Sequence, residues 1–237
     1  MSTPIHPPRH IATQQRKDTM KYDPSSANRP LQHSPFKALT VPRPIGWLSS
    51  VSAEGVENIA PYSQWQNLTF DPPMVMFAAN QYPDGSRKDT VINAEKTGWF
   101  VWNMATWGLR EQVNISAQAL KPGESEFDKM DVTRSYADLS PSPMIAESPF
   151  QYECKYITTH RMPGNSNVGS IDIVYASVER IHIDDNYLTD DGMIDILKAK
   201  PIARMGYYDY TVVTEKFEMR VPESDSDAQA GLSGNPT

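Results

Sequence analysis

The chain has 237 residues, a formal net charge of −7, and 39% hydrophobic and 10% aromatic residues. Such a chain is long and apolar enough to bury the core of one large domain or of a small pair. Its negative charge disfavours nucleic acid and anionic membranes as partners, because both carry charge of the same sign.

Cysteine and histidine are too sparse to predict a disulfide framework or a metal centre. The chain has one cysteine, and its five histidines show no pair at metal-ligand spacing. No apolar run approaches the ~18 residues of a membrane-spanning helix, and the first residues do not resemble a signal peptide. We therefore expect a cytoplasmic protein that does not span a membrane.

The two ends of the chain differ from its middle. Residues 1–30 are rich in proline and polar side chains without periodicity, which predicts a disordered or surface-draped arm. Residues 222–237 are acidic and rich in glycine and serine, which predicts a disordered tail. No linker interrupts the middle, so residues 31–221 are expected to form one domain.

The middle of the chain is predicted to be mainly β-structure with a few helices. PIGWLSSVS and VENIAPYS are joined by a turn at Gly55 and predict a hairpin. Four later runs combine β-branched, aromatic and other apolar residues, and they lie at residues 73–79, 98–104, 150–159 and 168–185. Several strands at this spacing predict a barrel or a sandwich.

A short helix is predicted directly after the sequence SRKDT. Asp89 is a suitable N-cap, Val91, Ile92 and Ala94 supply an apolar side, and Gly98 is a suitable stop.

A second helix is predicted from about Thr106 to Leu120. Leu109, Val113, Ala117 and Leu120 recur at helical spacing and form one apolar stripe. Packing against the core explains this stripe.

Two cations and a hydroxyl group precede the first helix. Arg87 can form forked hydrogen bonds, Lys88 supplies a point charge and Thr90 supplies a hydroxyl donor. A helix start stabilises anions through its free N–H groups and its dipole, so this segment is a candidate phosphate site. A solvated turn of mixed charge is the alternative.

A polar stretch, residues 58–73, lies between apolar strands. Its amide and hydroxyl side chains need partners if they approach the core, and a flat heteroaromatic ring is one candidate, with an ordinary polar loop as the alternative. Ser49 and Ser50 on the preceding strand could face the same pocket.

Five segments occur in the order and spacing of a known family. VPRPIGWLSS, GVENIAPYS, DPPMVMFAA, RKDTVIN and GWFVWN resemble the flavin reductase-like, FMN-binding split-barrel family, in particular its flavoredoxin-like branch. The later segments GESEFD, FQYECKY and PIARMGYYDY are also similar, so the resemblance covers roughly residues 36–210.

The resemblance implies a six-stranded antiparallel split barrel that forms a homodimer and binds FMN near the dimer interface. It implies a phosphate site at Lys88, Asp89 and Thr90, with Arg87 beside it. For the flavin ring it implies six further residues, Ser49, Ser50, Tyr62, Ser63, Gln64 and Asn67. Relatives often have Phe where this chain has Gln64, which alters the surroundings of the ring.

The resemblance further implies hydride transfer from NADH or NADPH to flavin N5, which requires no acid–base pair. His182 is the one weak catalytic candidate, placed near the nicotinamide, and a half-buried strand histidine is the alternative. His160 and Arg161 are candidates for binding substrate or a nucleotide phosphate, with exposed loop residues as the alternative.

Three functions remain open from the sequence. The chain could be an NAD(P)H:flavin oxidoreductase that supplies reduced flavin to a partner monooxygenase. It could keep FMN bound and act on its own small substrate, or carry electrons to an acceptor protein. It could also be a non-enzymatic FMN-binding module.

Overall fold

The computed structural model describes residues 19–26, 30–121 and 123–219. Most of the predicted N-terminal arm and all of the predicted tail, residues 222–237, lie outside this range, and the predicted domain limits stay a prediction. The chain divides into a unit of residues 1–35 and a unit of residues 36–237. In the first unit, Asp23 accepts hydrogen bonds from the backbone N–H and the hydroxyl of Ser25, which forms a turn.

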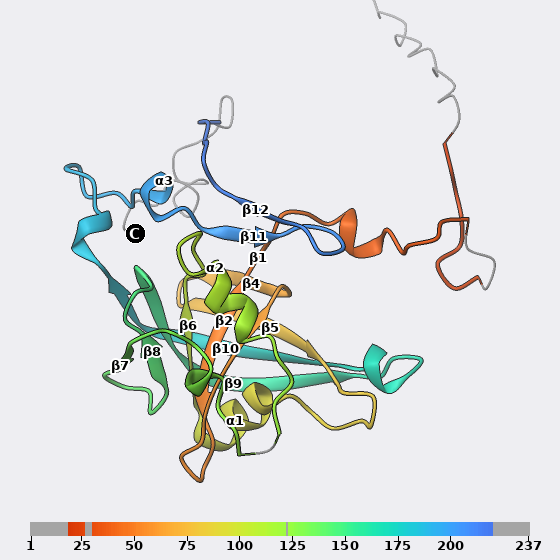
Figure 1. The fold of residues 1–237 in the computed structure, drawn as a ribbon, viewed down its shortest axis with the longest axis horizontal. Coiled ribbons are helices and arrows are strands. Elements are labelled where there is room, and N and C mark those ends of the chain that lie inside the picture. The colour runs from red at the N-terminus through yellow and green to blue at the C-terminus, as the bar shows by residue number, and fades with distance from the viewer. Residues whose placement is uncertain (1–18, 27–29, 122, 220–237) are drawn as a thin grey trace, which may run out of the picture. The chain divides into compact units, whose positions relative to one another are not determined.

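The second unit is built on an antiparallel sheet of seven strands in the order β3-β2-β6-β9-β10-β5-β4 (Figure 1). In chain order these strands are β2 (Gly46–Val51), β3 (Glu57–Tyr62), β4 (Trp65–Phe70), β5 (Pro73–Asn80), β6 (Trp99–Asn103), β9 (Phe150–Met162) and β10 (Ile171–Ile183). The predicted hairpin is the pair β2–β3, and each of the four later runs forms one of these strands.

Two smaller sheets and three α-helices complete the described part of this unit. One sheet has the order β1-β11-β12 and the other pairs β7 with β8. These strands are β1 (Arg43–Pro44), β7 (Arg134–Tyr136), β8 (Pro143–Ile145), β11 (Ile202–Arg204) and β12 (Tyr210–Val212), and the helices are α1 (Asp89–Thr97), α2 (Arg110–Ile115) and α3 (Ile196–Ala199). Single 3₁₀ turns lie at Phe36–Ala38, Glu126–Asp128, Asn167–Gly169 and Asp185–Tyr187.

The main sheet has one strand more than the six that we expected. Residues of the predicted polar stretch form β4, which pairs with β5 at the edge of the sheet. Only Trp65 of this strand is buried, and the remaining five residues are exposed. Polar side chains therefore fit this strand because it is an edge that lies in solvent in the single chain.

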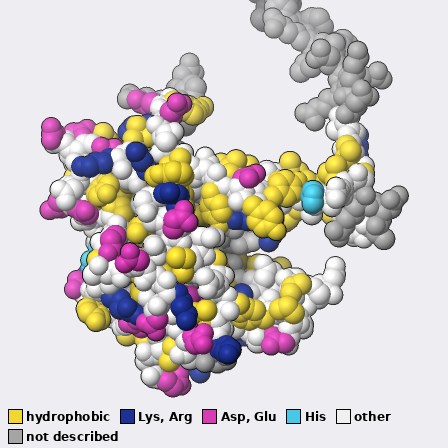
Figure 2. All heavy atoms as spheres, in the orientation of Figure 1, with side chains coloured by type: hydrophobic (Ala, Val, Ile, Leu, Met, Phe, Trp, Pro, Cys, Tyr) yellow, Lys and Arg dark blue, Asp and Glu magenta, His cyan; other side chains and the backbone are white. Residues whose placement is uncertain are grey.

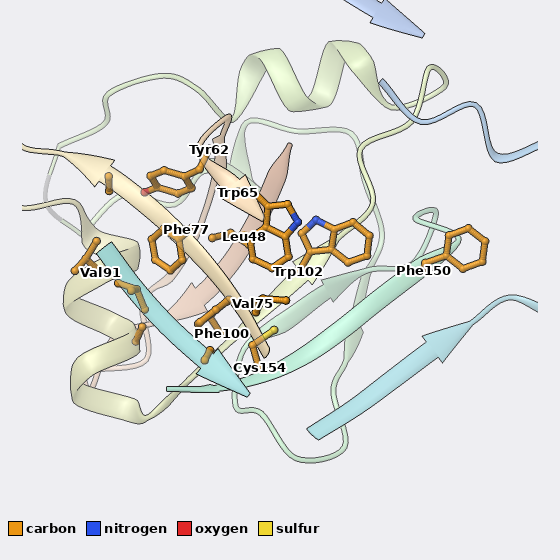
Figure 3. Close-up of a cluster of buried hydrophobic side chains, with 14 of the residues drawn as sticks. Leu48, Tyr62, Trp65, Val75, Phe77, Val91, Phe100, Trp102, Phe150 and Cys154 are labelled. Carbon is orange, nitrogen blue, oxygen red and sulfur yellow. The ribbon is translucent and has the colours of Figure 1, made fainter. Parts of the chain in front are cut away.

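The sheet rolls up, so that strands far apart in its order meet. Four strands separate β2 from β4 in the sheet order, yet a Cβ added to Gly46 of β2 would lie 2.9 Å from the Trp65 ring of β4. The Trp65 ring also stacks on Trp102 of β6, with centroids 5.8 Å apart and an angle of 3° between the planes (Figure 3). Because Gly46 has no side chain, the Trp65 ring can pack against β2. This contact closes one side of the barrel.

Two apolar cores lie on opposite faces of β2, because neighbouring residues of a strand point to opposite sides. Leu48 packs inside the barrel with Phe77 and Phe100 (Figure 3). Trp47 packs outside it with Ile59 and with Val113 of α2. The sheet is therefore covered on both faces where β2 runs.

Both predicted helices exist, with two corrections at their ends. Gly98 ends α1 in the left-handed conformation, with φ of 79°, as predicted. Asp89 is the first residue of α1 rather than its N-cap. The cap position belongs to Lys88, and no side chain caps the helix there.

The second helix is shorter than its apolar stripe predicts. It ends at Ile115, and the hydroxyl of Ser116 donates to the carbonyl of Val113 while it accepts from Nε1 of Trp47. Leu109 and Val113 are buried as expected, but Ala117 is exposed. The Ser116 hydroxyl turns the chain away from the core before the stripe is complete.

Charged side chains of both signs are interspersed on the face shown in Figure 2, without a large patch of one sign. No helix in the described part of the chain is long and apolar enough to cross a membrane.

Candidate functional site

A cavity opens at the start of α1, between that helix, strand β3 and the segment that follows α2. Lys88, Asp89 and Thr90 line it on the helix side. The other lining residues are Asn58, Ala60, Pro61, Tyr62, Tyr82, Ser116, Ala117, Gln118, Ala119, Leu120 and Glu126. Three of the four residues predicted to surround a phosphate therefore share one cavity with Tyr62.

A chain of buried hydrogen bonds forms the wall of this cavity. The Tyr62 hydroxyl donates to Oγ1 of Thr90 at 3.0 Å, and Thr90 donates to Oδ1 of Asn58 at 2.8 Å. Asn58 Nδ2 and the backbone N–H of Ile59 both donate to Oε2 of Glu126 at 3.1 Å. Burial raises the pKa of Tyr62, so its hydroxyl keeps its proton and remains the donor.

This network changes the role expected for the Thr90 side chain. A hydroxyl has a single proton, and in Thr90 that proton is directed to Asn58. The side chain is also fully buried. Thr90 therefore holds the cavity wall in place.

Lys88 is the cation of the cavity. Its Nζ lies 3.4 Å from the centroid of the Tyr82 ring, a cation–π contact. Burial lowers the pKa of Lys88, and the neighbouring charge of Asp89 opposes that shift. Lys88 forms no ion pair with a carboxylate in the described part of the chain. A partly buried cation without an ion pair is suited to bind an anion.

Ser49 and Ser50 lie on opposite faces of β2 and do not share a pocket. Ser50 faces α1, where it accepts from Asn93 Nδ2 at 3.1 Å and donates to Asn58 at 3.3 Å. Ser49 faces the other way, accepts from Asn103 Nδ2 at 3.2 Å and donates to the carbonyl of Pro143. Only Ser50 supports the cavity network.

The remaining residues predicted for the flavin ring lie at the β3–β4 turn and on the edge strand. Ser63 and Gln64 form the turn, and the carbonyl of Gln64 accepts from the N–H of Ala78. Asn67 is exposed on β4 and accepts from Gln66. None of the three lines the cavity at α1.

Arg87 points away from the cavity and into a separate ion-pair network. Its Nε lies 3.0 Å from Oδ2 of Asp172, and its Nη atoms lie 2.7 and 2.5 Å from the two oxygens of Glu95. Arg161 binds the other oxygen of Asp172 at 2.8 Å. Arg87 is thus neutralised by two carboxylates, and its predicted place beside a phosphate stays a prediction.

His182 contacts a buried carboxylate within the main sheet. Its Nε2 lies 2.7 Å from Oε1 of Glu153, a fully buried carboxylate on the neighbouring strand. Glu153 also accepts the backbone N–H groups of Asp138, Leu139 and Ser140. His182 lies outside the lining of the cavity at α1, and a catalytic role for it stays a prediction.

Asn58, Tyr82 and Glu126 are site residues that the sequence analysis did not single out. Glu126 lies within GESEFD, one of the segments that carry the family resemblance, and this was the available signal for it. Asn58 begins the polar stretch, but only its position opposite Ser50 shows its role. Tyr82 carried no signal in the sequence.

Solved structures identify the class of fold. Nitrilotriacetate monooxygenase component B from Bacillus cereus superposes with a TM-score of 0.77 at 25% identity, over 85% of this chain and all of that chain. Flavoredoxin from Desulfovibrio vulgaris superposes with a TM-score of 0.66 at 17% identity, over 86% of this chain and 99% of that one, which shows the fold alone. The fold is the FMN-binding split barrel.

Sequence comparison identifies the family. The model of the flavin reductase-like domain matches residues 38–210. An uncharacterized protein of Halalkalibacterium halodurans is 30% identical over 203 residues, which are 86% of this chain and 97% of that protein. The chain belongs to the flavin reductase-like family, which confirms the resemblance and the fold class predicted from the sequence.

The cavity at α1 fits the phosphate end of FMN. Lys88 supplies positive charge, and the dipole at the start of α1 adds to it. Asp89 and Glu126 add carboxylates to the same cavity, and these match hydroxyl groups rather than phosphate oxygens. FMN carries both kinds of group, since its ribityl chain has hydroxyls next to the phosphate ester.

Proposed function

We propose that this protein is an FMN-dependent NAD(P)H:flavin oxidoreductase. The observation that carries the proposal is Lys88, a partly buried cation without an ion pair among the described residues, at a helix start in a flavin reductase-like domain. When bound, FMN would supply the hydride acceptor, and the donor is NADH or NADPH.

In this proposal the protein binds and orients rather than moving protons. Lys88 and the N–H groups that begin α1 hold the phosphate. The network of Tyr62, Thr90 and Asn58 fixes the wall beside it. The rate of hydride transfer depends on the near-attack geometry of donor and acceptor. The main contribution of these residues is therefore to hold one end of the flavin in a fixed position.

We also propose that the chain acts as a homodimer in the cytoplasm. The edge strand β4 exposes Leu68 and Phe70 without a covering element in the single chain, and an open apolar edge favours pairing with another chain. The likeness to a monooxygenase component supports a role in supplying reduced flavin to a monooxygenase. A mass measurement by light scattering tests the dimer.

An absorbance spectrum of the purified protein with FMN, followed without oxygen after addition of NADH and then NADPH, tests the proposed reaction. Rapid bleaching of the flavin band is the expected result, and the faster donor is the physiological one. A bound flavin that neither nucleotide reduces contradicts the proposal and favours a binding module or a carrier with another electron donor. A protein that binds no flavin contradicts both.

A further inference from the structure

Glu126 is a buried acid in the wall of the cavity, and its binding of Asn58 and Ile59 does not occupy both of its oxygens. The side chain is 6% exposed. Oε2 accepts two N–H groups, from the side chain of Asn58 and the backbone of Ile59. These two bonds fix the plane and the position of the carboxyl group.

No other residue in the described part of the chain donates to the second oxygen, Oε1, and the backbone N–H of Glu126 itself also binds the carboxyl group. An ionised carboxylate offers about four acceptor positions, so these three N–H groups leave room for one more donor. Because the carboxyl group lines the cavity, a hydroxyl group of a ligand there can supply that donor.

The charges of the cavity show which donor fits. Its lining holds one cation, Lys88, against two acids, Asp89 and Glu126, and the start of α1 adds only about half a positive charge. A bare phosphate therefore gains little net attraction. A phosphate ester with neighbouring hydroxyl groups fits better, since its hydroxyls can donate to a carboxylate while its phosphate faces Lys88.

We infer that Glu126 is a ligand-binding carboxylate that accepts a hydrogen bond from a hydroxyl group of the flavin side chain next to the phosphate. The inference rests on the proposed binding of FMN and adds the element that recognises the ribityl chain. Glu126 then selects a phosphorylated polyol over a bare phosphate, while Lys88 selects the phosphate itself.

Three flavins distinguish the contributions of the parts of this site to binding. FMN carries the ring, the ribityl hydroxyls and the phosphate, riboflavin lacks the phosphate, and lumiflavin lacks both. Dissociation constants for all three are measured by flavin fluorescence titration with the wild type, with Glu126→Gln, and with Glu124→Gln, which removes an exposed acid two residues away. The Glu126→Gln substitution keeps the size of the side chain and one acceptor, but not the charge.

The expected result is a loss of affinity of about tenfold or more for both FMN and riboflavin in Glu126→Gln, because hydrogen bonds to charged groups are the stronger kind. The affinity for lumiflavin stays unchanged, and Glu124→Gln binds all three like the wild type. Glu126→Asp, which keeps the charge but withdraws the carboxylate by one methylene, shows the same selective loss and serves if the Glu126→Gln variant unfolds.

Three outcomes overturn the inference. Unchanged affinity for FMN and riboflavin shows that no hydroxyl binds Glu126. A gain for FMN alone shows that Glu126 only repels the phosphate. An equal loss for lumiflavin shows that Glu126 acts through the shape of the cavity. In all three the wild type still binds FMN, so the proposed function survives, whereas a wild type that binds no flavin overturns both.

Discussion

Arg87 and Lys88 are neighbours in the chain and cations of similar reach, yet they lie in regions with different roles. Arg87 is held by Glu95 and by Asp172, whose side chain is 1% exposed. Lys88 contacts the Tyr82 ring and lines a cavity without an ion pair among the described residues. One step along the chain thus separates a cation that is neutralised from one that is available to a ligand.

Two cations that are adjacent in the sequence therefore need not belong to the same anion site. Arg87 ties the segment before α1 to β10 through a carboxylate 85 residues away in the chain, which favours a fixed position for the start of that helix. Lys88 can then meet a ligand from a fixed backbone.

The largest expected effect is that of Asp172→Asn. Removal of this buried carboxylate leaves Arg87 and Arg161 without their shared partner and lowers the free energy of unfolding by about 3 kcal/mol. Urea unfolding followed by circular dichroism measures this, with Asp190→Asn at an exposed position as the control. Equal stability of the two variants would show that the network contributes nothing.

Arg87→Ala is expected to lower the free energy of unfolding by about 2 kcal/mol, because it leaves Asp172 with one cation instead of two. Arg87→Lys restores little of this, since an ammonium group cannot reproduce the forked contact with Glu95. Urea unfolding of both variants tests the point. A full rescue by lysine would mean that charge alone matters there.

Lys88→Ala is expected to change stability by less than about 0.5 kcal/mol but to weaken FMN binding about tenfold or more through the lost charge-assisted contact. Riboflavin, which lacks the phosphate, should bind this variant like the wild type. Lys96→Ala, an exposed lysine at the other end of α1, is the control in the same titration. Equal losses for the two flavins would remove Lys88 from the phosphate site.

The acid dependence of stability should be the smallest effect, because it depends on the shifted pKa values of single carboxyl groups. Burial raises the pKa of Asp172, but the hydrogen bonds from Arg161 and Arg87 outweigh it, so the pKa lies below its usual value. Its stabilising contribution is present above pH ~4 and is lost as the pH falls through the folded-state pKa.

The pKa shift of Glu126 has the opposite effect on the pH dependence of stability. Burial raises its pKa, so ionisation of Glu126 costs stability as the pH rises through the folded-state pKa. The contribution of Asp172 is tested by urea unfolding at pH values between about 3 and 7, which span the ordinary carboxyl range. Asp172→Asn is expected to lose less free energy of unfolding in acid than the wild type does. The same slope for both would contradict the assignment of Asp172.

The strands and the place of the candidate site were predictable from the sequence because both depend on local patterns. Apolar runs mark β5 and β6, and RKDT lies at a helix start in the structure as it does in the prediction. The opposite directions of Ser49 and Ser50 also follow from strand geometry, because neighbouring residues of a strand point to opposite faces.

The ion pairs of Arg87 and the early end of α2 have long-range causes. Asp172 follows Arg87 by 85 residues, so no local pattern shows that they pair. The early end of α2 depends on Ser116, which binds Trp47 69 residues earlier. Contacts of this kind exist only after the sheet has brought the two segments together.

The stacked indoles of Trp65 and Trp102 have a consequence for spectroscopy. Both side chains are buried, their planes differ by only 3°, and Trp65 begins the open edge strand β4. Two indole rings held this close together couple their excited states. Their near-ultraviolet circular dichroism therefore depends on their mutual orientation. The protein therefore carries its own optical reporter of whether its barrel is shut at β4.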